Sequence, residues 1–334
     1  MTLSVERAEA QFQGVHDDLE RLRRALNSVI VGQDELIDEL LTAVFSGGHV
    51  LLEGLPGLGK THLAKALARC LSLQLARIQC TPDLMPSDIT GSEILLQDER
   101  RTEQLGFRPG PIFASMVLVD EINRATPKTQ SALLEAMQEQ QVTYAGVQHP
   151  LPQPFWVLAT QNPIELEGTY PLPEAQLDRF AMKLKVSYPS AEALTRLIDV
   201  ALDAEPADHV PAQLDAARVQ DVLGCARAVV MSMPVKQAAV RLITATQPED
   251  DDAPTEAREH FRYGASPRAL QALLRCARVH ALLSGRAHLA IDDLAAVAKP
   301  VLRHRVLLRV DSEIGGTDVD QVLEDIIRQW HASV

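Results

Sequence analysis

The 334-residue sequence contains only four cysteines, and it lacks both a long hydrophobic run and an excess of basic residues. The cysteines form no C-x-x-C pair, and three of them lie in apolar patterns where cysteine acts as a small hydrophobic residue. This argues against disulfides and against a cysteine-bound metal at Cys70, Cys80, Cys225 and Cys276. No stretch approaches the roughly 18 apolar residues of a membrane span, and residues 1–6 resemble neither a signal peptide nor a transit peptide. We therefore expect a cytoplasmic protein.

The formal net charge of −13 disfavours nucleic acid as the main partner, because lysine and arginine supply most nucleic-acid affinity. A local basic pore within an acidic shell would still be compatible with this charge. The sequence also lacks an [NT]-K-x-D motif, which disfavours a GTPase. It has no internal repeat and no low-complexity segment, and its length corresponds to about two domains.

A glycine-rich motif predicts a nucleotide site. It follows the apolar run at 50–52, precedes a helical pattern at 63–71, and reads Gly54-Leu55-Pro56-Gly57-Leu58-Gly59-Lys60-Thr61, which matches G-x-x-x-x-G-K-[ST]. Its backbone N–H groups can surround phosphates, Lys60 can reach the β and γ phosphates, and Thr61 can ligate Mg²⁺. The following helix N-terminus adds partial positive charge. The alternative is a glycine-rich turn between core elements.

Strand-like and helical runs alternate before residue 190, which predicts an α/β domain with a parallel sheet. The expected strands are 50–52, 73–80, 116–119, 155–160 and 182–188. Beyond Ser190, alanine and leucine dominate, and helical patterns at 191–203, 213–231, 234–246, 267–284 and 291–306 predict a second, all-helical domain. The predicted division is an N-terminal amphipathic helix at 1–28, a core at 29–189, a helical lid at 190–310 and a helical tail at 311–334.

Two segments interrupt the alternation. Residues 88–107 predict a hairpin-like insertion with a polar tip at 97–100. Residues 142–149 form two β-prone runs around an Ala145-Gly146 turn. Both are either surface excursions or contacts for a partner.

Two strand ends carry candidate catalytic groups. The apolar run 116–119 ends in Asp120 and Glu121, which predicts that Asp120 holds Mg²⁺ and Glu121 polarises the attacking water. Asn162 follows the strand at 155–160, at the sheet edge where ligands bind, and its amide can orient water on the γ-phosphate. The alternatives are an ordinary strand-to-loop boundary at Asp120 and a turn begun by Asn162-Pro163.

Two arginines are candidates for stabilising transition-state charge. Arg179 follows Asp178 before the last strand and is a candidate arginine finger; a surface salt bridge with Asp178 is the alternative. Arg268 lies in the first turn of a helix capped by Ser266, where a cation is unfavourable. We therefore expect Arg268 to have an anionic partner, either a nucleotide phosphate or a carboxylate.

Together these motifs resemble the AAA+ ATPases and, more narrowly, the MoxR family. Further segments similar to that family are Gly48–Gly54, Thr81–Asp88, Gly106–Pro111, Val119–Ala125, Ala159–Pro163, Glu165–Gln176, Leu177–Phe180 and Ser266–Arg268. The resemblance covers about residues 29–305. One departure is leucine at positions 55 and 58, where family members often have alanine or valine; these positions face away from phosphate, so activity is still expected.

The resemblance implies a P-loop αβα sandwich with a five-stranded parallel sheet and a helical lid, assembled as a homo-oligomeric ring that is usually hexameric. It implies Lys60 and Thr61 as Walker A, Asp120 and Glu121 as Walker B, Asn162 as sensor 1, Arg179 as a finger acting in trans, Arg268 as sensor 2, and Arg124 as a second interface arginine. Further nucleotide contacts are expected at His62, Val31 and Gly32, with Thr61 and Asp120 as the Mg²⁺ ligands. The two hairpins correspond to the helix-2 insert and the hairpin before sensor 1.

Family members are chaperone-like remodellers, often paired with von Willebrand A-domain proteins in maturation or metal insertion. We therefore expect Mg²⁺-dependent ATP hydrolysis coupled to remodelling of a protein client. A von Willebrand A-domain partner would be a separate chain, because no such domain is visible in this sequence. Two alternatives stay open: a nucleic-acid motor on the same fold, with the hairpins tracking DNA, and a nucleotide-gated scaffold with little turnover.

Overall fold

The centre of the structure, a computed structural model that describes residues 2–97, 103–164, 168–201 and 210–334, is a parallel sheet of five strands. Their order across the sheet is β2 (Leu75–Gln79), β5 (Met116–Asp120), β8 (Trp156–Gln161), β1 (His49–Glu53) and β9 (Phe180–Lys185). Strands β5, β8 and β1 are almost entirely buried, as expected for a parallel sheet covered on both faces. The predicted sheet is confirmed.

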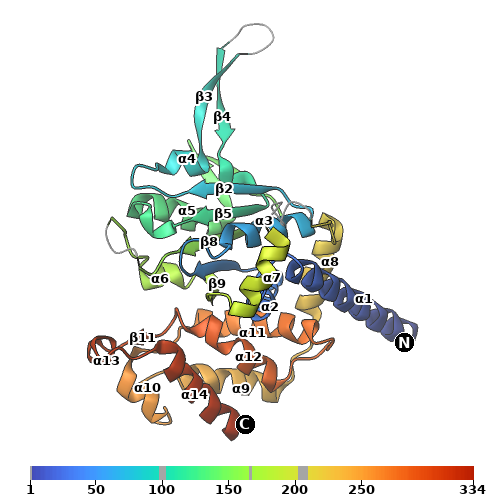
Figure 1. Cartoon of the computed structure of the whole chain (residues 1–334), viewed down its shortest axis with the longest axis vertical. Helices are drawn as coiled ribbons and strands as arrows, with labels where there is room; N and C mark the ends of the chain where they lie inside the picture. The colour runs from blue at the N-terminus through green and yellow to red at the C-terminus, as the bar shows by residue number, and fades with distance from the viewer. Residues whose placement is uncertain (1, 98–102, 165–167, 202–209) are drawn as a thin grey trace.

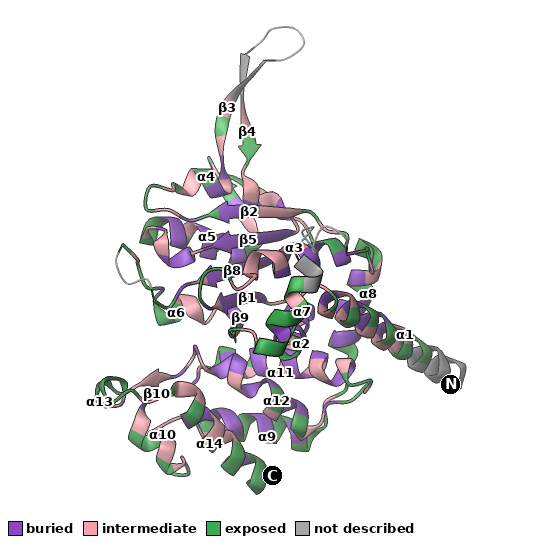
Figure 2. Ribbon diagram, in the orientation of Figure 1, coloured by how far each residue is buried: buried purple, intermediate pink, exposed green. Residues whose placement is uncertain are grey.

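Successive residues of β1 enter different hydrophobic clusters, because side chains alternate across a strand. Val50 and Leu52 pack in a cluster with residues of α1 (Thr2–Asn27), α2 (Asp34–Phe45) and α3 (Lys60–Cys70). Leu51 packs in the other cluster with residues of α4 (Pro86–Thr90) and α5 (Pro127–Glu139). Buried residues concentrate in the sheet and in the helix faces toward it (Figure 2). The result is the predicted αβα sandwich.

Both predicted hairpins are present. Strands β3 (Gly91–Gln97) and β4 (Glu103–Pro109) pair antiparallel and project from the sheet domain (Figure 1), while residues 98–100 of the expected polar tip lie outside the described residues. Strands β6 (Gln141–Tyr144) and β7 (Val147–Pro150) pair around Ala145 and Gly146, both of which have positive φ. Such a turn matches the twist of the strands that it joins.

An aromatic cluster joins the two hairpins. The Phe107 ring of β4 stacks on the His149 ring of β7, with ring centroids 4.1 Å apart. Phe107 also contacts Tyr144 of β6 at 5.4 Å and Phe113 at 5.7 Å between centroids. Phe113 belongs to the short helix η1 (Pro111–Phe113). Side chains far apart in the sequence thus hold the two excursions side by side.

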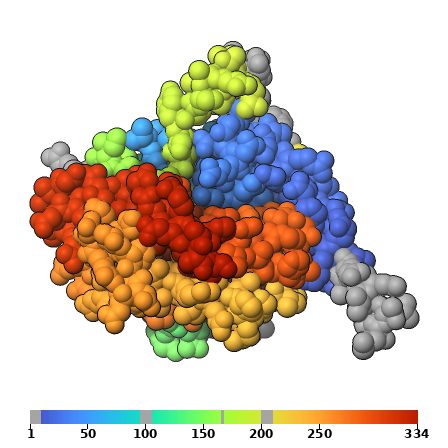
Figure 3. All heavy atoms as spheres, turned by 90° about the horizontal axis from the view of Figure 1, so that it is seen from below, coloured from blue at the N-terminus to red at the C-terminus, as the bar shows by residue number. Residues whose placement is uncertain are grey.

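The chain after β9 is mainly helical, as predicted. Its helices are α7 (Ala191–Ala201), α8 (Ala216–Ala228), α9 (Met233–Thr244), α10 (Thr255–His260), α11 (Pro267–Leu283), α12 (Ile291–Leu302), α13 (Val310–Ile314) and α14 (Val319–Ser333). Seen from below, orange and red residues of this part form most of the lower face (Figure 3).

The expectation of an entirely helical lid is wrong in one detail. Strands β10 (Phe261–Tyr263) and β11 (Leu307–Leu308) pair antiparallel between α10 and α13. The pairing lets Phe261 be fully buried while its strand's backbone keeps hydrogen-bond partners. Three residues are too few for a periodic pattern in the sequence.

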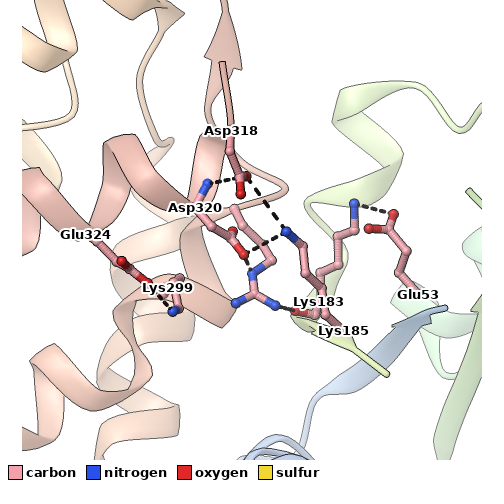
Figure 4. Close-up of polar contacts among 8 residues, drawn as sticks. Glu53, Lys183, Lys185, Lys299, Asp318, Asp320 and Glu324 are labelled. Carbon is pink, nitrogen blue, oxygen red and sulfur yellow. Dashed lines mark hydrogen bonds and ion pairs between the residues drawn. The ribbon is translucent and has the colours of Figure 1, made fainter. Parts of the chain in front are cut away.

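Ion pairs join α14 to the sheet (Figure 4). Asp320 forms ion pairs with Lys185 at 2.7 Å and with Arg303 at 3.1 Å, and Lys183 pairs with Glu53 at 2.6 Å. Arg303 follows α12, so one carboxylate connects α14, α12 and β9. Residues on both sides of the predicted boundaries at 189 and 310 therefore pack together, and the boundaries themselves stay predictions.

No helix in the described part of the chain has both the length and the hydrophobicity that a bilayer crossing requires. All four cysteines are buried free thiols. Burial raises the pKa of Cys80 to about 12 and the pKa values of Cys70 and Cys276 to about 11, so these thiols stay protonated at neutral pH.

Candidate active site

The glycine-rich motif connects β1 to α3. Gly57 and Gly59 have φ of +81° and +80°, a region that side chains rarely adopt, so glycine is needed at both turns. Gly54 serves a different purpose, because a Cβ there would lie 2.8 Å from the Val186 carbonyl oxygen. The turn aims the N-terminus of α3 at a cavity beyond the carboxyl ends of the strands, which is an anion-binding arrangement.

This cavity, of about 330 Å³, brings together most of the predicted phosphate and metal residues. Its lining residues are Pro56, Gly57, Gly59, Lys60, Thr61, His62, Arg77, Gln79, Asp120, Glu121, Thr160 and Asn162. Lys60 donates to the Gly54 carbonyl oxygen, which holds its ammonium group over the cradle. We call this the cradle cavity. Leu55, which is 38% exposed, does not line it.

The two carboxylates at the end of β5 have different surroundings. Asp120 is buried and accepts from Arg77 Nε at 2.7 Å and from Thr160 Oγ1 at 3.3 Å. Glu121 has a left-handed backbone with φ of 56°, and its N–H donates to Thr160 Oγ1 at 2.9 Å. Thr160 of β8 therefore fixes the turn that carries both carboxylates.

The Glu121 carboxylate is oriented by two donors. Gln79 of β2 donates to its Oε2 at 3.2 Å, and Arg124 of η2 (Ile122–Arg124) donates to the same atom at 3.1 Å. Arg124 thus contacts the Glu121 carboxylate of its own chain. Its expected role across an interface stays a prediction.

Asn162 both makes a turn and lines the cradle cavity, so the structure is compatible with both interpretations of this residue. Its side chain is buried, and its Oδ1 accepts from the Ile164 N–H at 3.2 Å, which makes the expected turn. The same side chain lines the cradle cavity. Because the carbonyl oxygen is used in the turn, the amide NH₂ group is the part available to a phosphate oxygen or a water.

A second, more apolar cavity of about 320 Å³ adjoins the cradle and shares Gly57, Gly59 and His62 with it. Its other lining residues are Val29, Ile30, Val31, Gln33, Leu58, Tyr188, Pro189, Leu194 and Leu197. Gly32 does not line it, but a Cβ there would lie 2.5 Å from the Ala193 Cβ, so glycine lets this segment pack against α7. An apolar cavity beside a phosphate-binding motif is suited to the flat aromatic ring of a nucleotide base.

The two candidate arginines line a third cavity, of about 350 Å³, which shares no lining residue with the cradle cavity. We call it the arginine cavity. It includes residues 46–49, at the amino end of β1, whereas the cradle follows the carboxyl end. The five residues of β1 separate these ends by about 13 Å. Within one chain, therefore, Arg179 and Arg268 are not part of the cradle cavity.

Two alternatives that the sequence left open for these arginines are not found among the described residues. Asp178 pairs with Arg305 at 2.6 Å, so the alternative of an Arg179 salt bridge with Asp178 is wrong. Arg179, which follows α6 (Glu174–Leu177), donates instead to the Leu134 carbonyl oxygen at 2.5 Å. Across the described ranges the Arg268 side chain has neither an ion pair nor a hydrogen bond, so its expected anionic partner is not a carboxylate in that part of the chain.

Sequence reasoning missed several cavity residues. Arg77 and Gln79 alternate on β2 and reach Asp120 and Glu121 on the neighbouring strand. Polar residues two apart at the end of a predicted strand were the available signal. Tyr188, which is 70% exposed after β9, was a weaker signal for the apolar cavity.

Comparisons with known proteins agree with this geometry. The model of the ATPase family associated with various cellular activities (AAA) matches residues 49–182, and the model of the AAA lid domain matches residues 253–326. The chain is 41% identical over 306 residues to Chaperone MoxR1 of Mycobacterium tuberculosis, covering 91% of this chain and 79% of that protein. It is 32% identical over 337 residues to Protein MoxR of Methylorubrum extorquens, covering 96% and 95% respectively. A crystal structure from Cytophaga hutchinsonii matches with a TM-score of 0.90 and 36% identity, covering 98% of both chains.

This chain belongs to the MoxR family of AAA+ ATPases. The AAA match contains the cradle, both carboxylates, Asn162 and Arg179, and the lid match contains Arg268. As a MoxR-type protein it is an ATPase of a chaperone-like family, and the predicted fold and family are confirmed.

Proposed function

We propose that this MoxR-type chain hydrolyses Mg²⁺-bound ATP at the interfaces of a homo-oligomeric ring, in keeping with a hexamer, and uses the energy to remodel a protein client. The observation that carries the proposal is the separation of the cradle cavity from the arginine cavity at opposite ends of β1. A ring brings one chain's arginine cavity to its neighbour's cradle.

The cradle residues fit a nucleotide with its metal. Backbone N–H groups and Lys60 would hold the phosphates, and the apolar cavity with Val31 and Leu58 would hold adenine. Thr61 and Asp120 supply the oxygen ligands that Mg²⁺ prefers, and the ion would neutralise charge on the phosphates. Glu121, oriented by Gln79, would accept the proton of the attacking water.

The arginine cavity supports action in trans. Arg179 and Arg268 lie together on it, and Arg268 has no anionic partner within the described residues. A cation in the first helical turn is unfavourable unless an anion approaches. The γ-phosphate on a neighbouring chain would supply that anion, and the two guanidinium groups would stabilise its transition state.

The client function rests on the family and on the projecting hairpins. One relative is named a chaperone, and the hairpin β3–β4 extends away from the ATPase core (Figure 1). By extension from the family, we propose maturation or metal insertion of the client together with a von Willebrand A-domain protein. The net charge of −13 disfavours the nucleic-acid motor, and the presence of Glu121, Asn162 and Arg179 in one chain disfavours a scaffold with little turnover.

Phosphate release and ring formation test this proposal. Glu121→Gln should retain ATP and assemble with it, yet lose about 10²–10⁴-fold in turnover, because the general base is removed. Glu135→Gln on the exposed face of α5 is the matched control and should keep full activity. Normal phosphate release by Glu121→Gln, or full activity in a strict monomer, would refute the proposal. Tight, salt-dependent DNA binding would favour the nucleic-acid motor instead.

A further inference from the structure

The lid holds the backbone segment that carries Arg179. Arg305 follows α12, and only 2% of its side chain is exposed. Its guanidinium donates to the Asp178 carboxylate and to the main-chain oxygens of Asp178, Phe180 and Ala181. These acceptors lie on both sides of Arg179. A side chain from the lid therefore fixes the backbone on each side of the candidate finger.

The same carboxylate reaches the helix that carries Arg268. Asp178 Oδ1 accepts from Arg305 Nε at 2.6 Å, and its Oδ2 accepts from Ser266 Oγ at 2.9 Å. Ser266 is the N-cap residue of α11, two positions before Arg268. One carboxylate thus joins the Arg179 segment to the start of α11.

The two arginines have few contacts of their own to hold them in position. Among the described residues, the Arg179 side chain makes one hydrogen bond, to the Leu134 carbonyl oxygen, and the Arg268 side chain makes none. Their relative placement therefore depends on the backbone segments that bear them. A misplacement of about 1 Å in a catalytic group can cost ~10²-fold in rate, so this backbone geometry matters.

We propose that Asp178 and Arg305 form a clamp that positions Arg179 and Arg268 as a pair for the nucleotide of the neighbouring chain. The inference rests on the proposed function, in which these arginines act in trans. Asp178 and Arg305 are positioning residues, since their side chains are occupied by each other, by Ser266 and by main-chain oxygens.

The contacts of the Asp178–Arg305 ion pair are better explained by a role in positioning the backbone than by a contribution to folding stability. A buried ion pair is weak support for stability, because desolvation offsets much of its attraction. The planar arginine fork, in contrast, can hold several acceptors in fixed directions at once, which a lysine or an apolar residue cannot. Four acceptor groups around Arg179 use that capacity.

Kinetics of the assembled protein test the clamp. Asp178→Asn should lower kcat about 10–100-fold with unchanged ATP affinity, because the cradle is intact while the arginines are displaced. Ser266→Ala should give a smaller loss of kcat, and Ser266→Thr, which keeps the hydroxyl, should have nearly wild-type activity.

Asp293→Asn is the matched control: Asp293 is a fully buried lid carboxylate paired with Arg286 and His280, away from the arginine cavity. It should lower the melting temperature without lowering kcat. An unchanged kcat in Asp178→Asn would overturn the clamp.

Mixed rings identify the site on which Asp178 acts. Lys60→Ala chains lack a working cradle but keep their arginines, so mixing them with Asp178→Asn chains should create active interfaces, about a quarter of the total in an equal random mixture. Recovery in an Arg179→Ala and Lys60→Ala mixture without recovery in the Asp178→Asn mixture would overturn the clamp alone. Recovery in neither mixture would overturn the trans arrangement and the clamp with it. If Asp178→Asn does not fold, Ser266→Ala takes its place in the same mixture.

Discussion

The cavities at the two ends of strand β1 differ in how many of their charged groups have partners within one chain. At the carboxyl end, Asp120 and Glu121 already have partners within the chain, and the cradle glycines are in place. At the amino end, Arg179 and Arg268 line a cavity that contains few carboxylates and no cradle residue. Under the proposed function, one chain binds nucleotide at its cradle end, whereas its arginine end acts on the nucleotide of another chain. Nucleotide binding and hydrolysis should therefore be separable by mutation.

The largest separation is expected from Arg179→Ala. Loss of an arginine finger should reduce turnover by about 10³–10⁵-fold while ATP binding stays intact, because the cradle is not touched. Phosphate release and binding of a fluorescent ATP analogue measure the two effects. Arg328→Ala, an exposed arginine of α14, removes the same charge and should change neither. An equal loss of ATP affinity in Arg179→Ala would place this arginine at its own cradle and end the contrast.

Arg268→Ala should give the next largest effect, a loss of about 10²–10³-fold in turnover, as for removal of one transition-state donor. Arg268→Lys should recover part of that loss, because it keeps the charge but not the planar fork. Single-turnover phosphate release at saturating ATP measures both variants. If dilute monomers of Arg268→Ala bind ATP more weakly than wild-type monomers do, Arg268 contacts its own nucleotide and the contrast fails.

His49 should make stability at the arginine end depend on pH. Burial lowers its pKa from 6.5 to about 4, and its ring bonds the Met137 oxygen and the Val157 N–H. The unfolded chain therefore binds a proton that the folded chain does not, so stability falls as pH drops from 6.5 to 4, by about 3 kcal/mol for this group.

His49→Gln can keep both hydrogen bonds without titrating. It should therefore reduce the pH dependence of the unfolding free energy, measured by urea denaturation between pH 4 and 7. Comparison with wild type isolates this group from His304, whose pKa is also lowered by burial. Identical pH profiles for the two proteins would show that His49 does not contribute.

Arg77→Gln should give the smallest effect, at the cradle end. Arg77 pairs with the proposed Mg²⁺ ligand Asp120, but 56% of its side chain is exposed, so the pair contributes at most about 1 kcal/mol. Its removal should raise Mg²⁺ affinity by no more than about five-fold, measured by Mg²⁺ titration of ATP hydrolysis. Weaker Mg²⁺ binding would instead make Arg77 a supporting residue of the metal site.

Much of the cradle end could be predicted from the sequence because its signals are local. Lys60, Asp120 and Asn162 each follow an apolar strand, and the carboxyl ends of parallel strands meet at one edge of the sheet. The arginine end depends on tertiary contacts instead. Nothing local indicates that Arg305 binds Asp178, 127 positions earlier, or that α11 brings Arg268 to the amino end of β1.

Fine details of the cradle were also beyond the sequence. Gln79 and Arg77 have no distinguishing local pattern, and their role depends on the pairing of β2 with β5, which places Gln79 opposite Asp120.

The short pairing of β10 with β11 in the lid has no periodic pattern, because it joins two segments of only two or three residues that lie more than 40 positions apart. Such features arise from packing, which overrides local preference.

The stack of Phe107 on His149 has a mechanical consequence. Because the two rings lie face against face at the roots of both hairpins, neither hairpin can swing far without separating them. A force on the long hairpin would therefore be transmitted to the short one, and through it to strand β8, which Asn162 follows. Under the proposed function, a protein client would therefore contact the two hairpins as one rigid unit and not as two independent elements.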